Sequence, residues 1–165
     1  MTFTIAFTGH RPDDLGGYNE SNPVRDTLKV QLRQVLLQYK VEHPDLLCIS
    51  GMALGFDQWA AEVCVELGIP FTAAIPFVGF DSIWSAEQRD KYNRLRVQAL
   101  NVHFVCSGGY EAWKMQKRNE WMVDHCDVLV AAWNGEQIGG TWNTVKYARK
   151  KERQEVNLLP VPVAR

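Results

Sequence analysis

Two glycine-containing turns in the sequence place backbone donors and polar side chains directly before a predicted helix. One is Ser50-Gly51-Met52-Ala53-Leu54-Gly55-Phe56-Asp57, and the other is Gly139-Gly140-Thr141. Backbone N–H groups at the start of a helix favour an anion, most often a phosphate. Neither turn matches the Walker A or G-x-G-x-x-G pattern, so each signal is weak by itself. The predicted ligand contacts in the two turns are Ser50, Gly51, Met52, Gly55, Gly139, Gly140 and Thr141.

A third candidate loop, Thr8-Gly9-His10-Arg11-Pro12, follows the first predicted strand. Gly9 lets the backbone approach a ligand closely, and His10 and Arg11 supply hydrogen-bond donors. Ligands of open parallel sheets bind beyond the carboxyl ends of the strands, which favours a binding role for this loop. The alternative is an ordinary surface turn with a solvated arginine.

Arg118 and Asn119 lie on a predicted helix face that is otherwise largely apolar. The residues that recur there at spacings of three and four are Met115, Arg118, Asn119, Met122 and Cys126. Burial of an unpaired guanidinium is costly, so packing alone does not explain Arg118. Arg118 either pairs with a carboxylate such as Asp124 or Asp127, or it reaches into a pocket and binds an anionic ligand. We therefore predict Arg118 and Asn119 as ligand contacts.

Aromatic and acidic side chains complete the set of candidates. Phe77 and Trp84 could wall a base or a sugar, because aromatic faces stack on flat ligands; alternatively, both close the edge of the core. Asp57 and Glu87 are the candidate catalytic carboxylates, and Arg118 is the third candidate catalytic residue. Asp57 could instead cap the helix that follows it, and Glu87 could serve only the helix dipole.

The composition is that of an ordinary globular domain. The chain has 165 residues, of which 46% are hydrophobic and 22% charged, with a formal net charge of −1. This length favours one domain over residues 1–165. The missing basic excess argues against a protein that coats nucleic acid, whereas a small phosphorylated ligand needs only a few donors.

Several classes of protein are disfavoured by what the sequence lacks. The four cysteines form no C-x-x-C pair and read as buried free thiols, so no metal site is predicted, and no cofactor is predicted either. No apolar run approaches the ~20 residues of a membrane span, and Met1–Ile5 lacks the basic start of a signal peptide. We therefore expect a cytoplasmic protein.

Short apolar runs alternate with amphipathic stretches along the chain. The predicted strands are Phe3–Phe7, Leu46–Ile49, Phe71–Ile75, Val102–Val105, Asp127–Trp133 and Val156–Leu159. The predicted helices are 23 to about 42, 56–67, 85–100, one within 110–125, and 140–152. This alternation predicts an α/β fold of three layers, with a mostly parallel sheet of about five to six strands and helices on both faces. The uninterrupted apolar strands are expected when both faces of a sheet are covered.

These motifs together resemble the YpsA-like branch of the SLOG superfamily, which also contains the Smf/DprA and LOG proteins. The matching segments are Thr8-Gly9-His10-Arg11-Pro12, Ser50 to Asp57, Arg118-Asn119-x-x-Met122-Val123 and Gly139-Gly140-Thr141. They occur in the family's order, and the resemblance covers roughly Phe3 to Ala148. It implies a Rossmann-like domain that binds nucleotides or nucleotide-derived ligands.

The LOG members of that superfamily are phosphoribohydrolases, which cleave the N-glycosidic bond of nucleoside monophosphates. Arg118 and Met122 match the first part of the LOG pattern, but Asn143 and Thr144 stand where that pattern has Glu. An amide cannot stabilise the positive charge that develops on the sugar as a carboxylate does. The resemblance therefore leaves Asn143 as a ligand contact, and Asp57 or Glu87 as substitutes for the missing carboxylate.

The leading hypothesis is a domain that senses or sequesters a phosphorylated nucleotide-derived small molecule, such as an ADP-ribose-like or cyclic nucleotide signal. The alternative is an N-glycoside hydrolase that acts on a nucleotide. Single-stranded DNA binding, by analogy with the Smf/DprA branch, is a weaker third hypothesis. Tryptophans such as Trp113, Trp121 or Trp142, together with the dimers common among LOG-like relatives, predict a homodimer.

Overall fold

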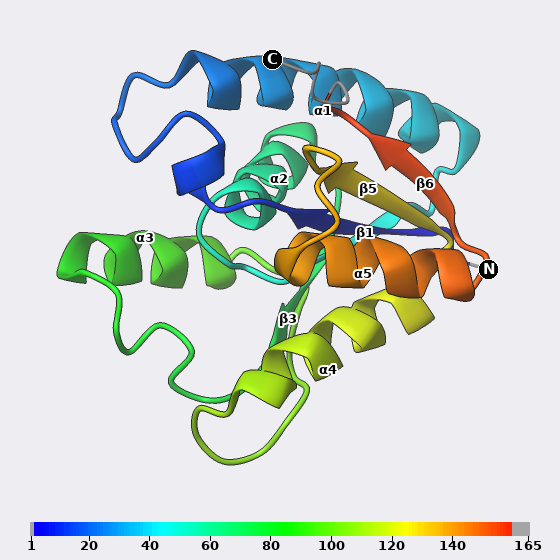
Figure 1. The fold of residues 1–165 in the computed structure, drawn as a ribbon. Coiled ribbons are helices and arrows are strands. Elements are labelled where there is room, and N and C mark those ends of the chain that lie inside the picture. The colour runs from blue at the N-terminus through cyan, green and yellow to red at the C-terminus, as the bar shows by residue number, and fades with distance from the viewer. Residues whose placement is uncertain (1, 160–165) are drawn as a thin grey trace.

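The computed structural model describes residues 2–159, which form one parallel six-stranded sheet with helices on both faces (Figure 1). The strands are β1 (Thr4–Gly9), β2 (Leu47–Ser50), β3 (Phe71–Ile75), β4 (Asn101–Phe104), β5 (Val128–Ala132) and β6 (Gln154–Asn157). The helices are the short 3-10 helix η1 (Pro12–Asp14) and the α-helices α1 (Pro23–Glu42), α2 (Phe56–Leu67), α3 (Ala86–Arg96), α4 (Ala112–Asp124) and α5 (Gly139–Lys150). The predicted α/β, Rossmann-like fold class is confirmed.

Two hydrophobic clusters fix the layers of the fold. Ile5 and Phe7 of β1 point to the face that α1 and α2 cover, and Ala6 between them points to the face that α4 and α5 cover. Strands β3 and β5 are buried at every position. Burial on both faces explains why their sequences are continuous apolar runs and do not alternate with polar residues.

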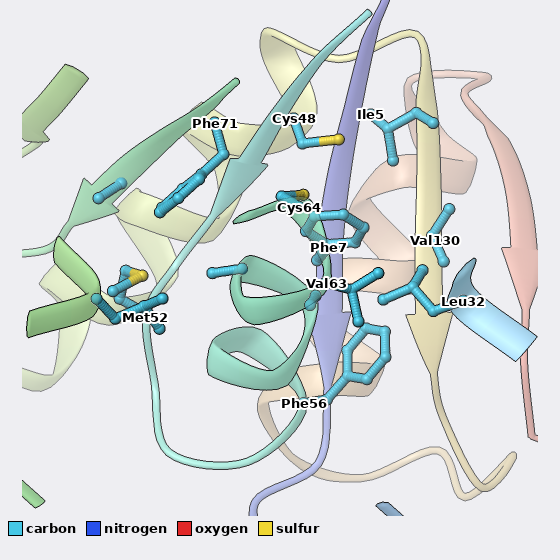
Figure 2. Packing of buried hydrophobic residues seen from close by; sticks show 14 of the residues in the cluster. Ile5, Phe7, Leu32, Cys48, Met52, Phe56, Val63, Cys64, Phe71 and Val130 are labelled. Carbon is cyan, nitrogen blue, oxygen red and sulfur yellow. The ribbon is translucent and has the colours of Figure 1, made fainter. Parts of the chain in front are cut away.

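The larger cluster contains the aromatic contact that anchors α2 to the sheet. The rings of Phe7 on β1 and Phe56 at the start of α2 meet edge to face, with centroids 6.2 Å apart (Figure 2). Leu32 of α1 and Val63 of α2 are buried in the same cluster. These contacts fix the start of α2, and hence the turn between β2 and α2, against the end of β1.

Helix boundaries follow local capping signals. The side chain of Asn22 accepts the N–H of Arg25 at 3.0 Å directly before Pro23 opens α1. Ser85 and Gln88 form a reciprocal capping box at the start of α3. Gly68 ends α2 with a φ of 68°, a left-handed conformation that glycine adopts without steric cost.

Two predicted helix ends are wrong by a few residues. Helix α3 ends at Arg96 and not at Leu100, because the chain must turn before β4, whose pairing with β3 begins at Asn101. Helix α5 begins at Gly139 and ends at Lys150, two residues before the predicted Glu152. The φ of 58° at Glu152 is incompatible with a right-handed helix.

The last strand is also displaced from its predicted position. Strand β6 covers Gln154–Asn157, whereas the sequence predicts Val156–Leu159. Its pairing with β5 decides the boundary, because Gln154 lies opposite Val128 at the start of that strand. Pro160 and Pro162, which follow this strand in the sequence, lie outside the described residues.

The strand order, β4-β3-β2-β1-β5-β6, determines where a ligand can bind. From β1 the chain builds outward to β4, then returns across the sheet to place β5 on the other side of β1. The connections that leave β1 and β5 therefore diverge to opposite faces. A crevice forms at such a switch point, beyond the carboxyl ends of the two strands.

Candidate functional site

A cavity of about 590 Å³ lies at the carboxyl ends of β1 and β5. The residues predicted from sequence that line it are Gly9, His10, Arg11, Asp57, Arg118, Asn119, Gly139, Gly140 and Thr141. They come from the β1 exit, the start of α2, helix α4 and the start of α5. The topology thus brings together candidates that lie more than a hundred residues apart in the chain.

The N-terminus of α5 faces this cavity without a side-chain cap. Ile138 stands at the cap position and accepts no hydrogen bond from the first turn. A Cβ built on Gly139 or Gly140 would meet nothing within 4 Å, so the backbone there is open. Free N–H groups and the positive end of the helix dipole make this edge of the cavity suitable for an anion.

The loop after β1 is tied to the loop after β5. The imidazole Nε2 of His10 accepts the backbone N–H of Asn134 at 3.0 Å. The N–H of His10 donates to the carbonyl of Ala132 at 3.3 Å. His10 therefore spans the switch point and fixes the width of the crevice. Arg11, the next residue, is exposed and lines the cavity.

The turn between β2 and α2 lies behind the cavity wall. The hydroxyl of Ser50 donates to the carbonyl of Asp57 at 2.7 Å and accepts the N–H of Met52 at 3.1 Å. The Met52 side chain is fully buried, with a backbone φ of 62°. Ser50, Gly51, Met52 and Gly55 do not line the cavity; they hold in place Asp57, which does.

Arg118 is buried, with 3% of its surface exposed, and reaches the cavity from α4. Its Nη1 donates to the carbonyls of Gly51 at 2.5 Å and Ala74 at 3.2 Å, and its Nε donates to the Asn119 side chain at 2.9 Å. Burial lowers the pKa of its guanidinium, while Asp57 opposes that shift. Two backbone carbonyls thus orient the cation without neutralising it.

The carboxylates that the sequence offered as partners of Arg118 bind elsewhere. Asp127 accepts the backbone N–H of Thr4 at 2.8 Å, and Asp124 accepts the hydroxyl of Tyr147 at 2.8 Å. Among the salt bridges of residues 2–159, none involves Arg118. Of the two alternatives, the geometry favours the arginine that reaches into a pocket.

Asp57 is the acidic group closest to this arginine. It is 8% exposed, and its Oδ1 is buried without a hydrogen-bond partner in the described part of the chain. Burial raises the pKa of Asp57 from 3.8 to about 6, and the charge of Arg118 only partly opposes this shift. Gly55, not Asp57, holds the cap position of α2, so the carboxylate is free of that role.

A protein-family model described as the YspA SLOG family matches residues 5–161. The chain belongs to the YspA SLOG family. A UPF0398 protein of Bacillus cereus is 29% identical over 153 residues, which are 89% of this chain and 83% of that protein. The resemblance drawn from the glycine turns and Arg118 is confirmed.

Two solved structures share the fold at low sequence identity. DNA processing protein A (DprA) of Streptococcus pneumoniae matches with a TM-score of 0.64 and 18% identity, covering 93% of this chain and 49% of DprA. DprA of Helicobacter pylori, whose structure concerns single-stranded DNA binding, matches with a TM-score of 0.65 and 16% identity, covering 93% and 63%. This chain therefore spans half to two thirds of each DprA, and these likenesses show the fold alone.

Glu87 and Asn143 are two further predicted site residues that lie outside this cavity. Glu87 is exposed and lines a separate depression together with Tyr18 and Trp59. Asn143 is exposed on α5 and does not line the cavity either. Two helical steps of 100° turn Asn143 away from the face that carries Thr141, which lines the cavity. Asp57 is therefore the sequence-predicted carboxylate that the structure places at the site.

Several residues that line the cavity were not predicted as site residues from the sequence. They are Asp13, Asp14, Ala53, Met115, Asn134, Glu136 and Ile138. Asn134 and Glu136 follow β5 directly, so the rule that placed Gly9 to Arg11 at the site also applies to them. The acids of η1 give no comparable signal, because the fold of the loop after Pro12 decides where they point.

The remaining predicted features concern the whole molecule. No helix within residues 2–159 is long and apolar enough to cross a membrane. The four cysteines are unpaired; Cys48, Cys64 and Cys126 are buried, and Cys106 is half-buried. Trp142 stacks on Trp133 within the chain, with ring centroids 5.5 Å apart, while Trp113 is exposed.

Proposed function

We propose that the cavity at the β1/β5 switch point binds a phosphorylated, nucleotide-derived small molecule. The observation that supports this most is the pairing of two cationic elements in one cavity: the uncapped start of α5 and the buried guanidinium of Arg118. An anion between them would meet backbone N–H groups and a fixed charge. Arg11, which is exposed, adds a second cation to the cavity lining.

The acidic residues of the cavity favour a sugar phosphate over a simple anion. Asp13, Asp14 and Asp57 line the same space as Arg118. Their carboxylates repel a bare polyanion but accept hydrogen bonds from ribose hydroxyls. A nucleotide presents both groups, so it suits a cavity of mixed charge. ADP-ribose-like molecules and cyclic nucleotides are the candidates, bound as signals that this domain senses or sequesters.

The test is ligand-dependent thermal stability. Millimolar AMP, ADP-ribose or cyclic AMP should raise the melting temperature of the wild-type protein, because a ligand that binds only the folded state stabilises it. Arg118→Met should abolish the rise. Arg118→Lys, which keeps the charge, should retain part of it. Lys117→Met removes an exposed cation from the same helix and should leave the rise unchanged.

The proposal fails if the wild-type melting temperature does not move with any of these ligands. It also fails if Lys117→Met and Arg118→Met reduce the shift equally. In that case ligand binding would depend on the net charge of the protein and not on this cavity.

A second candidate function is hydrolysis of the N-glycosidic bond of a bound nucleotide. The observation that favours it is the unpartnered, buried Oδ1 of Asp57 at the cavity wall. With its pKa raised to about 6, this carboxyl is present in both protonation states near neutral pH. It could stabilise the developing positive charge on the sugar or activate the attacking water. Water would add to the sugar carbon as the base leaves with a proton.

Chromatography for free adenine separates binding from turnover. If Asp57 carries the reaction, AMP should yield adenine and ribose 5-phosphate, and Asp57→Asn should abolish the product. Glu87→Gln is the matched control, since Glu87 lies outside the cavity. If AMP binds and no adenine is released, the proposed binding function stands and the proposed hydrolase function is wrong.

Three further inferences, on oligomeric state, location and ligand class, are part of the proposal. We infer a homodimer and a cytoplasmic location, and we place nucleic acid below a small molecule as the ligand. The net charge of −1 supports this last ranking. Light scattering at micromolar concentration checks the dimer. Salt-sensitive binding to oligonucleotides would reverse the ranking.

A further inference from the structure

A second cavity, of about 340 Å³, lies beside the first and is lined mainly by aromatic and aliphatic side chains. Buried Phe77 and Phe80 form part of its wall, with their rings edge to face and centroids 6.0 Å apart. Trp84 packs on Phe80 at 5.1 Å, and Tyr110 packs on Phe77 at 5.8 Å. The sequence singled out Phe77 and Trp84, but Phe80 and Tyr110 complete this aromatic cavity.

The rim of the aromatic cavity is exposed although it is apolar. Ile83 is 91% exposed and Tyr110 is 73% exposed. A rim of this kind costs free energy in water unless something covers it. Its place beside a polar cavity gives the reason to expect a ligand there.

The two cavities are adjacent and share part of their lining. Arg11 and Met115 line both of them. The guanidinium carbon of Arg118, which lines the first cavity, lies 5.5 Å from the ring centroid of Phe80, which lines the second. A single molecule with a charged end and an apolar end can therefore occupy both. A nucleotide has this character, with its phosphate at one end and a flat ring at the other.

The aromatic walls are held in place before any ligand binds. The buried ammonium of Lys114 donates to the carbonyls of Ser107 and Gly109, each at 2.7 Å, which fixes the loop that carries Tyr110. Trp84 directly precedes the capping box that Ser85 forms at the start of α3. Such pre-ordering lowers the entropy cost of binding a flat ring.

We propose that the aromatic cavity is the subsite for the base of the nucleotide, an inference that rests on the proposed function. The polar side chains that line it are few: Arg11, Ser82 and the Tyr110 hydroxyl. Stacking and apolar contact therefore supply most of the base affinity, and stacking tolerates any base because every base has a π-face. The subsite distinguishes a ligand that has a base from one without it, but barely distinguishes adenine from guanine.

The experiment compares AMP, GMP and ribose 5-phosphate by isothermal titration calorimetry. Wild-type protein should bind AMP and GMP within about threefold of each other, and both should bind at least about tenfold tighter than ribose 5-phosphate. The double variant Ile83→Ala, Tyr110→Ala should weaken AMP about tenfold and leave ribose 5-phosphate unchanged. Both residues are exposed, so the variant should fold. Val78→Ala, at a residue 68% exposed that does not line the cavity, is the matched control.

The possible outcomes distinguish failure of the base subsite from failure of the proposed function. Equal affinity of wild-type protein for AMP and ribose 5-phosphate overturns the base subsite and leaves the proposed phosphate site standing. No binding of any of the three ligands overturns the proposed function itself. A double variant that binds AMP normally but changes its mass in light scattering would assign the exposed rim to a second copy of the chain, and would overturn the subsite.

Discussion

The two glycine turns at this edge of the sheet differ in what surrounds their glycines. In the β2–α2 turn, a Cβ on Gly55 would lie 2.6 Å from the His10 carbonyl oxygen, and one on Gly51 would lie 2.7 Å from Arg118 Nη1. In the turn that opens α5, a Cβ on Gly139 or Gly140 would meet nothing within 4 Å. The first turn uses glycine to let chain segments approach each other, and the second leaves the backbone accessible to a ligand.

Among the substitutions that test this difference between the two turns, one at Gly55 should have the largest effect, and that effect is on stability. Gly55→Ala places a methyl group against the backbone of His10 and Arg11, where a φ of 98° is already unfavourable for any other residue. Strain and overpacking together should lower the free energy of unfolding by roughly 3–5 kcal/mol. Chemical denaturation of the wild-type protein and the variant measures this loss. A loss below about 1 kcal/mol would show that the turn is not as tightly packed as its geometry indicates.

The β2–α2 turn positions Asp57. Titration of its carboxyl group should make the free energy of unfolding depend on pH. Because burial raises its pKa from 3.8 to about 6, the folded state binds this proton more tightly than the unfolded state does. Its contribution to stability is therefore fully present below about pH 4 and is lost as pH rises through about 6. The difference across this window is about 3 kcal/mol.

Denaturation of the wild-type protein and Asp57→Asn between pH 4 and 7 tests this dependence. The variant lacks the titrating group, so its stability relative to wild type should increase with pH. Parallel stability curves for the two proteins would contradict the burial argument. Asp127→Asn is a control, because that carboxylate is exposed to solvent and its replacement should not reproduce the trend.

Sequence alone predicted the order of the elements and named half of the residues that line the cavity, because both depend on local signals. Apolar runs marked the buried strands, and position after a strand marked Gly9, His10 and Arg11. The roles of Ser50 and Met52 could not be predicted, since the hydrogen bonds of the Ser50 hydroxyl and the burial of the Met52 side chain exist only in the folded turn. Glu87 and Asn143 had plausible chemistry, but the helix phase and the path of the chain place them outside the cavity.

A substitution at Gly51, in the packed β2–α2 turn, should change ligand affinity more than it changes stability. A methyl group there would press on the ends of two side chains, Arg118 Nη1 and Asp57 Oδ2 at 2.9 Å, and both ends can shift. Gly51→Ala should therefore lower the free energy of unfolding by only about 1–2 kcal/mol. Because the shift moves Arg118, the affinity for AMP should fall about tenfold. Calorimetry together with denaturation checks whether affinity changes more than stability.

Gly140→Ala should have the smallest effect on stability and thereby completes the comparison. Open space surrounds the new methyl group, and alanine favours helix over glycine, so the free energy of unfolding should change by less than about 1 kcal/mol and tend to increase. The methyl group enters the cavity beside the free N–H groups, so AMP should still bind more weakly. A variant that binds AMP as well as wild type would place the phosphate away from α5, with Arg118 and Arg11. Weaker binding at unchanged stability would show that the open turn serves the ligand, whereas Gly51 and Gly55 serve the fold that holds Arg118 and Asp57 in place.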